Sequence, residues 1–150
     1  MLYLLDVNVL ITAHNTYYAI DSVPEFWEWI AYYASNGTLK MPVEIYEEIK
    51  DGGTDEKTDL LFAWVTKKEI KSALVLEEEV DEKHVADCTC TGYAPDLTDE
   101  ELFQVGRDPF LIAYAMASPQ QRCVVTNEAS APSKQRQNRR VPDVCKTMGV

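Results

Sequence analysis

Leu2-Tyr3-Leu4-Leu5-Asp6-Val7-Asn8-Val9-Leu10-Ile11 is the stretch that decides the fold. Its first four residues are apolar or aromatic, and so short a run predicts a buried strand that ends at Asp6. In an open parallel sheet, the carboxyl ends of the strands border the crevice where ligands bind. Asp6 is therefore either the N-cap of the next helix or a carboxylate that serves catalysis or metal binding.

Short apolar runs alternate with helical patterns along the rest of the chain, which is typical of an α/β domain. Two capping boxes, Ser22 with Glu25 and Thr98 with Glu101, mark helix starts, and Asp108 followed by Pro109 predicts an N-cap with Pro at the first helical position. Strands are predicted at 2–5, 39–41, 73–76 and 122–126, and helices at 8–18, 22–35, 42–49, 55–70, 77–90, 98–105, 108–117 and 141–148.

The composition is that of an ordinary soluble protein, with 150 residues, 46% hydrophobic and 26% charged. This length suits a single domain over residues 1–150. No apolar run is long enough to span a membrane and no signal peptide is recognisable, so we expect a cytoplasmic protein with no membrane contact. Its four cysteines are then expected to be reduced thiols. His84, Cys88 and Cys90 match known zinc-ligand spacings poorly.

Basic residues gather late in the chain. The net charge of −11 argues against a general nucleic-acid-binding surface. Residues 129–150, however, carry five basic side chains against one acid, whereas residues 1–128 carry nine basic and 24 acidic ones. The stretch 133–140 is either a solvated loop or a loop that contacts phosphates.

Several acids are expected to meet at one edge of the sheet. Asp6 and Glu128 each follow a strand, Asp108 begins a buried helix, and Glu44, Glu47 and Glu48 share a short helix. Carboxylates brought this close need either raised pKa values or a divalent cation. Oxygen ligands without histidine favour Mg²⁺ or Mn²⁺. Such a site suits the hydrolysis of a phosphodiester by a metal-activated water.

The chain resembles the PIN domain, the ribonuclease fold of VapC-type toxins. The resemblance rests on Leu-Leu-Asp6-Val-Asn8-Val-Leu, on Glu48-Ile-x-x-Gly52, on Asp108-Pro-Phe-Leu-Ile-Ala and on Val-Val-Thr126-Asn127-Glu128, in that order. It implies a three-layer α/β domain with a central parallel sheet between helices, and a Mg²⁺ or Mn²⁺ site that cuts RNA. It implies Asp6, Glu48, Asp108 and Glu128 as the catalytic metal ligands, with Glu44 as the fallback for Glu48. It further implies that Asn8, Thr126 and Asn127 orient these ligands. With RNA as the substrate, the basic residues of the 133–140 stretch would bind the RNA backbone beside the site, namely Lys134, Arg136, Arg139 and Arg140.

The sequence departs from the family in two ways. Family members often have Asp where this chain has Glu128, whose longer side chain would hold a metal only through water or not at all. PIN domains also commonly continue into a last strand and helix, whereas this sequence stops at Val150. Either more chain follows or a sheet edge is uncovered, which would favour a homodimer.

Other functions remain open at this stage. A haloacid-dehalogenase-type phosphatase needs a second Asp where Asn8 stands, and a receiver domain needs a strand-end Lys that is not apparent. A PIN-fold interaction module without catalysis would keep the fold and bind no cation. For a toxin, the resemblance also implies an antitoxin protein that blocks the site.

Overall fold

The computed structural model describes residues 1–52 and 59–150, and its centre is a parallel sheet of four strands in the order β3-β2-β1-β4. The strands are β1 (Leu2–Leu5), β2 (Leu39–Pro42), β3 (Val75–Leu76) and β4 (Arg122–Val125). All three pairings are parallel. The chain is therefore an α/β protein with a parallel sheet between helices, as predicted.

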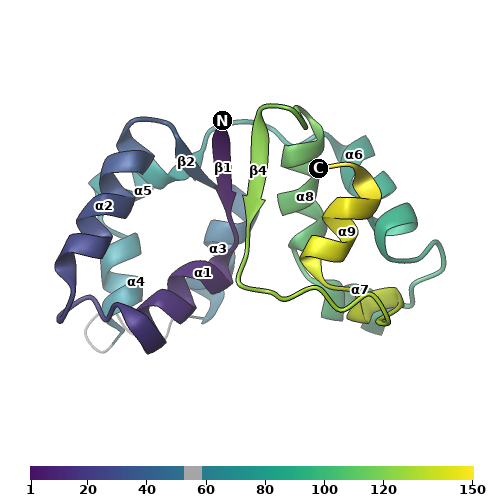
Figure 1. Cartoon of the computed structure of the whole chain (residues 1–150), viewed down its shortest axis with the longest axis horizontal. Helices are drawn as coiled ribbons and strands as arrows, with labels where there is room; N and C mark the ends of the chain where they lie inside the picture. The colour runs from purple at the N-terminus through teal and green to yellow at the C-terminus, as the bar shows by residue number, and fades with distance from the viewer. Residues whose placement is uncertain (53–58) are drawn as a thin grey trace.

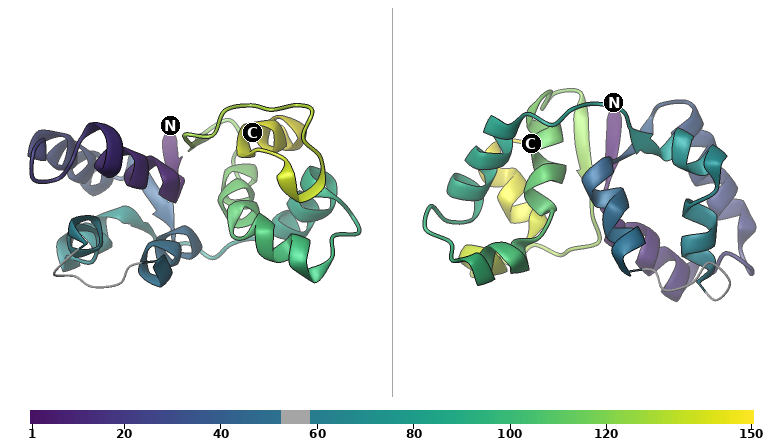
Figure 2. Two further views of the ribbon diagram at one scale, coloured as in Figure 1. Left: turned by 90° about the horizontal axis from the view of Figure 1, so that it is seen from below. Right: turned by 180° about the vertical axis from the view of Figure 1, so that it is seen from behind.

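Helices cover both faces of the sheet, and Figures 1 and 2 show α2, α4 and α5 on one side of β1 and β4 and α6 to α9 on the other. The helices are α1 (Val7–Thr12), α2 (Pro24–Ser35), α3 (Val43–Gly52), α4 (Leu60–Val65), α5 (Lys68–Leu74), α6 (Glu82–Asp87), α7 (Asp99–Val105), α8 (Asp108–Met116) and α9 (Val141–Met148). Wider π-helical turns extend α1 over Ala13–Tyr17 and α6 over Cys88–Tyr93. Within the described residues, no helix combines the length and the apolar character that a membrane span requires.

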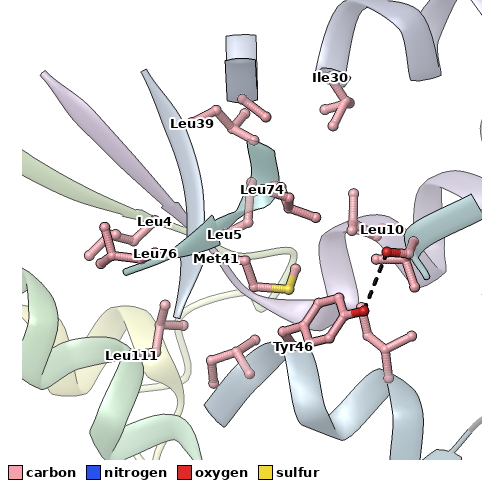
Figure 3. Close-up of a cluster of buried hydrophobic side chains, with 14 of the residues drawn as sticks. Leu4, Leu5, Leu10, Ile30, Leu39, Met41, Tyr46, Leu74, Leu76 and Leu111 are labelled. Atoms are coloured by element: carbon pink, nitrogen blue, oxygen red, sulfur yellow. Dashed lines mark hydrogen bonds between the residues drawn. The ribbon is translucent and has the colours of Figure 1, made fainter. Parts of the chain in front are cut away.

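The core lies on both faces of β1. Leu4 and Leu5 are fully buried and, as successive strand residues, point to opposite faces. Figure 3 shows Leu111 of α8 on the side of Leu4, and Leu10 of α1 on the side of Leu5. Helix α8 was predicted to be buried because it is apolar all round, and five consecutive residues, 111–115, are indeed buried.

The predicted capping box at Ser22 is wrong. The hydroxyl of Ser22 donates to Asp21, and α2 begins at Pro24 without a side-chain cap. Proline at the first turn has its φ already fixed for a helix, which explains the later start. The second box is confirmed, because Thr98 and Glu101 make both reciprocal hydrogen bonds.

The helix predicted over 55–70 is two helices. Residues 55–58 lie outside the described part of the chain, and α4 ends at Val65. The hydroxyl of Thr66 donates to the carbonyl of Phe62 at 2.7 Å, an alternative partner that favours a helix end. Helix α5 then continues through Leu74, which is fully buried, so the strand predicted over 73–76 shortens to β3.

The helix predicted over 77–90 begins later than predicted, because most of the acidic run over 77–82 precedes it. Helix α6 begins only at Glu82, because the carboxylate of Asp81 accepts a hydrogen bond from the backbone N–H of Lys83 and caps it there. The last helix was predicted correctly, and it ends at Gly149 with a left-handed φ of 78°.

Candidate active site

The carboxyl ends of β1 and β4 lie side by side. Leu5 pairs with Val125, and the backbone N–H of Asp6 donates to the carbonyl of Val125 at 2.9 Å. In Figure 1 both strands point toward the edge where α1, α3 and α7 lie. The residues that follow the two strands, Asp6 and Thr126, therefore meet at this edge.

Asp6 is the one charged residue that is fully buried in the described part of the chain, with 4% of its surface exposed. Its Oδ1 accepts from the backbone N–H of Asn8 at 3.3 Å, so it caps α1. Its Oδ2 accepts from the Asn8 amide at 2.6 Å and from the Thr126 hydroxyl at 2.7 Å. Burial raises the pKa of Asp6, with a smaller contribution from Glu128, although the hydrogen bonds of Thr126 and Asn8 oppose it. This geometry is compatible with both predicted roles of Asp6, as a helix cap and as a site carboxylate.

Asn8, Thr126 and Asn127 form one hydrogen-bonded group around Asp6. The backbone N–H of Asn127 donates to the Oδ1 of Asn8 at 3.0 Å, and the Asn127 amide donates to the Asn8 carbonyl at 3.2 Å. The N–H of Glu128 donates to the Thr126 hydroxyl at 3.2 Å. The segment after β4 is thus tied to the start of α1, which fixes the Asp6 carboxylate.

Asp108 is the first residue of α8 rather than its N-cap, a position that Arg107 takes without a side-chain bond. Pro109 is therefore the second helical residue rather than the first, still within the first turn, where its missing N–H costs no intrahelical hydrogen bond. Burial raises the pKa of Asp108 to about 7, and the carboxylates of Asp6, Glu128 and Glu48 add to this shift. The hydroxyl of Tyr93, a residue that the sequence did not single out, donates to its Oδ2 at 3.4 Å.

Glu48, and not its fallback Glu44, belongs to this acidic group. Burial raises the pKa of Glu48, and Asp6 raises it further, whereas Arg107 lowers it. The carboxylate of Glu44 instead lies near Tyr114, where it contributes, after burial, to a tyrosine pKa of about 12.

Arg107 joins α3 to α8 beside the acids. One guanidinium nitrogen donates to the carbonyl of Glu44 at 2.8 Å, and another pairs with Asp51 at 2.8 Å. This arginine was not predicted as a site residue, because its only signal in the sequence is its place next to Asp108. It offsets part of the negative charge and holds the Glu48 helix against α8.

Glu128 lies near Asp6 and Asp108 but its oxygens are engaged elsewhere. Its Oε2 accepts from the backbone N–H of Val141 at 2.8 Å, and its Oε1 pairs with Arg140 at 3.3 Å. It therefore caps the start of α9. In residues 1–52 and 59–150, no three His, Cys, Asp or Glu side chains are arranged to hold a metal ion together. The donor chemistry of Asp6, Glu48 and Asp108 nevertheless fits a hard divalent cation, which would relieve their mutual repulsion.

A polar pocket of about 240 Å³ adjoins Asp108 and Glu128. Three of the four basic residues predicted to bind RNA, Lys134, Arg139 and Arg140, line it. Arg136 does not line the pocket, because it is held in ion pairs with Asp96 and Glu101 at 2.7 Å each.

Arg139 is also engaged at the pocket wall. Its guanidinium donates to the carbonyls of Gly92 and Asp143, and to the hydroxyl of Thr147 at 2.7 Å. These bonds anchor the 133–140 stretch to α9 and to the π-helical turn after α6. The structure therefore gives Arg136 and Arg139 roles in holding the fold, and leaves Lys134 exposed at the pocket.

Comparison with known proteins identifies a family without a described function. A family model for a domain of unknown function, DUF4411, matches residues 3–150, and the chain belongs to this family. No curated protein and no solved structure matches the chain.

Proposed function

We propose that this protein is a metal-dependent endoribonuclease with a PIN-like active site. One observation carries the proposal: three acids from separate elements, Asp6 after β1, Glu48 on α3 and Asp108 on α8, lie close together. Asp6 raises the pKa of Glu48, and Asp6 and Glu48 both raise the pKa of Asp108. Partly buried carboxylates that repel one another lower the stability of the fold. Groups of this kind are therefore typical of functional sites.

Asp6, Glu48 and Asp108 would hold Mg²⁺ or Mn²⁺. When bound, the cation would activate a water for attack on an RNA phosphodiester and stabilise the leaving oxygen. Thr126 and Asn8 orient Asp6 through their hydrogen bonds, and Tyr93 does the same for Asp108. Lys134 and Arg140 supply positive charge for the RNA backbone, which compensates for the acidic surface elsewhere.

An interaction module without catalysis is the second candidate. It is favoured by the bonds of Glu128 to α9, which occupy a carboxylate that the PIN resemblance assigns to the metal. A module of this kind would keep the acids only as helix caps and would gain no stability from a cation.

The biological setting is also part of the proposal. We place the enzyme in the cytoplasm as the toxin of a toxin–antitoxin pair, with an antitoxin protein and a second copy of the chain as partners. The four cysteines are free thiols, a state that a reducing compartment favours. A short basic or DNA-binding protein encoded in the neighbouring gene would support the antitoxin.

The decisive experiment is cleavage of labelled single-stranded RNA by the purified protein with Mn²⁺ and with EDTA. Asp6→Asn and Glu48→Gln are the test variants. Glu47→Gln is the matched control, because Glu47 lies next to Glu48 on α3 but faces solvent. We expect cleavage by wild type and Glu47→Gln in Mn²⁺ only, and a loss of at least a hundredfold in both test variants.

A thermal-shift titration with Mn²⁺ separates the two candidates. A cation that binds the acids only in the folded protein raises the unfolding temperature by mass action. Absence of both cleavage and a Mn²⁺ shift in wild type would overturn the nuclease and support the interaction module.

A further inference from the structure

Three carboxamide side chains line the same pocket as Asp108 and Glu128. Gln104 comes from α7, and Gln137 and Asn138 come from the 3₁₀ turn Arg136–Asn138. Among the residues that the structure describes, none of these three side chains forms a hydrogen bond, and neither does the ammonium group of Lys134. A carboxamide offers a donor and an acceptor together. The pocket therefore presents paired hydrogen-bonding groups beside the candidate active site.

The ion pairs of Arg136 hold two walls of this pocket in place. Its Nε and one terminal nitrogen donate to the two oxygens of Glu101 at 2.8 and 2.7 Å, a bidentate geometry. Glu101 lies one turn before Gln104 on α7, and Arg136 directly precedes Gln137. The ion pair therefore fixes helix α7, which carries Gln104, relative to the turn that carries Gln137 and Asn138.

Arg139 fixes the other end of the turn. It donates to the backbone carbonyls of Gly92 and Asp143, so residues 136–139 are anchored on both sides of the two carboxamides. Because this turn is already anchored, it loses less conformational freedom when a ligand binds, which improves affinity.

We infer that this pocket is a base-recognition subsite, which binds the nucleobase next to the scissile phosphate of single-stranded RNA. The inference rests on the proposed ribonuclease function. Proteins read single-stranded RNA by hydrogen bonds to exposed base edges. Gln and Asn pair in a bidentate way with adenine, so adenine is the base that Gln104, Gln137 and Asn138 select. Lys134 holds the adjoining phosphate and reads no sequence.

The test uses short labelled oligouridines that carry one central adenine, guanine or cytosine, together with the unmodified oligouridine. Wild type is compared with Gln137→Ala/Asn138→Ala, with Lys134→Ala and with Gln135→Ala, all with Mn²⁺. Gln135 is the matched control, because it is an exposed glutamine of the same segment that does not line the pocket. Thermal unfolding of each variant confirms that it is folded.

We expect wild type and Gln135→Ala to cut next to adenine about tenfold faster than next to the other bases. In Gln137→Ala/Asn138→Ala this preference falls to less than about threefold. In Lys134→Ala the preference stays, but cleavage of all four RNAs weakens equally and depends less on salt. A preference that survives in the double variant, or equally fast cleavage of all four RNAs by wild type, overturns the subsite.

A binding measurement distinguishes failure of the subsite from failure of the nuclease. Fluorescence anisotropy with the same RNAs is recorded on Asp6→Asn, with and without Gln137→Ala/Asn138→Ala. Adenine-selective binding that disappears in the combined variant supports the subsite even if wild type cuts nothing. Equal binding of all four RNAs by Asp6→Asn contradicts it, whatever the cleavage assay shows.

Discussion

The hydroxyl of Thr126 lies 2.7 Å from the Oδ2 of Asp6 and donates a hydrogen bond to it, although 120 positions separate the two residues. The amide of Asn8 donates to the same oxygen at 2.6 Å. Hydrogen bonds to a carboxylate favour its charged form, whereas burial favours the neutral one. Burial dominates, so the pKa of Asp6 is raised while its orientation stays fixed.

Replacing Thr126 by Val removes this donor at nearly constant volume. We expect the affinity for Mn²⁺ to fall about tenfold, because groups that orient a metal ligand typically contribute at this level. The measurement is a Mn²⁺ titration of the unfolding temperature. Thr126→Ser keeps the hydroxyl and serves as the control. Equal Mn²⁺ affinity in Thr126→Val and wild type would show that the bond does not serve a cation.

A second buried cluster, which includes Cys88, Val144 and Cys145, lies between the π-helical turn after α6 and helix α9, and Gly92 is packed tightly beside it. A Cβ at this position would lie 2.6 Å from the Cγ1 of Val144 and 3.5 Å from the Sγ of Cys88. We expect Gly92→Ala to lower the free energy of unfolding in urea by about 1–3 kcal/mol through overpacking.

A second substitution tests this explanation for Gly92. Adding Val144→Ala removes the clashing methyl group, so the double variant should be less destabilised than the sum of the two single variants. Strict additivity would show that the clash with Val144 is not the cause.

Local pattern and parallel-sheet geometry made part of this site predictable. Leu2–Leu5 and 122–125 are short apolar runs, and parallel strands bring the residues after them, Asp6 and Thr126, to one edge. The position of Glu48, rather than Glu44, followed from the PIN resemblance and agrees with the electrostatic coupling to Asp108.

Roles that depend on distant partners were not predictable. The sequence does not distinguish Lys134, Arg136 and Arg139, which all lie in one basic stretch. In the structure, Arg136 pairs with Glu101, 35 residues away, and Arg139 donates to the carbonyl of Gly92, 47 residues away. No periodicity or capping motif encodes such pairs. The start of α2 was missed for a different reason, since Ser22 matched a capping box but Pro24 offered a better first turn.

The pKa of about 7 for Asp108 predicts a pH-dependent stability. Because the unfolded value is near 3.8, the folded state binds more protons between these limits, and stability falls as pH rises from about 4 to about 7. Asp108→Asn removes this fall in stability with rising pH, because asparagine does not ionise. In EDTA we expect its unfolding temperature to exceed that of wild type by roughly 5 °C at pH 8 and by much less at pH 4.

Asp143 provides a control of opposite sign. Hydrogen bonds from Ser130 and from the backbone of Ala131 lower its pKa, so it stabilises the fold above its unfolded pKa and loses this effect as pH falls. Asp143→Asn should therefore lower the unfolding temperature at pH 8. If Asp108→Asn is equally or less stable than wild type at pH 8, the raised pKa of Asp108 in the folded protein is contradicted.

Glu128 caps helix α9, and this role can be separated from metal binding. Its Oε2 accepts from the N–H of Val141 at 2.8 Å, and a glutamine carbonyl would accept the same bond. We expect Glu128→Ala to lower the free energy of unfolding by about 1 kcal/mol in urea, and Glu128→Gln to lower it much less. Because both oxygens are engaged by Val141 and Arg140, Glu128→Gln should keep the Mn²⁺ shift in unfolding temperature that Asp6→Asn loses. Loss of that shift in Glu128→Gln would instead show that the carboxylate leaves α9 and binds the cation, as in the PIN-domain pattern.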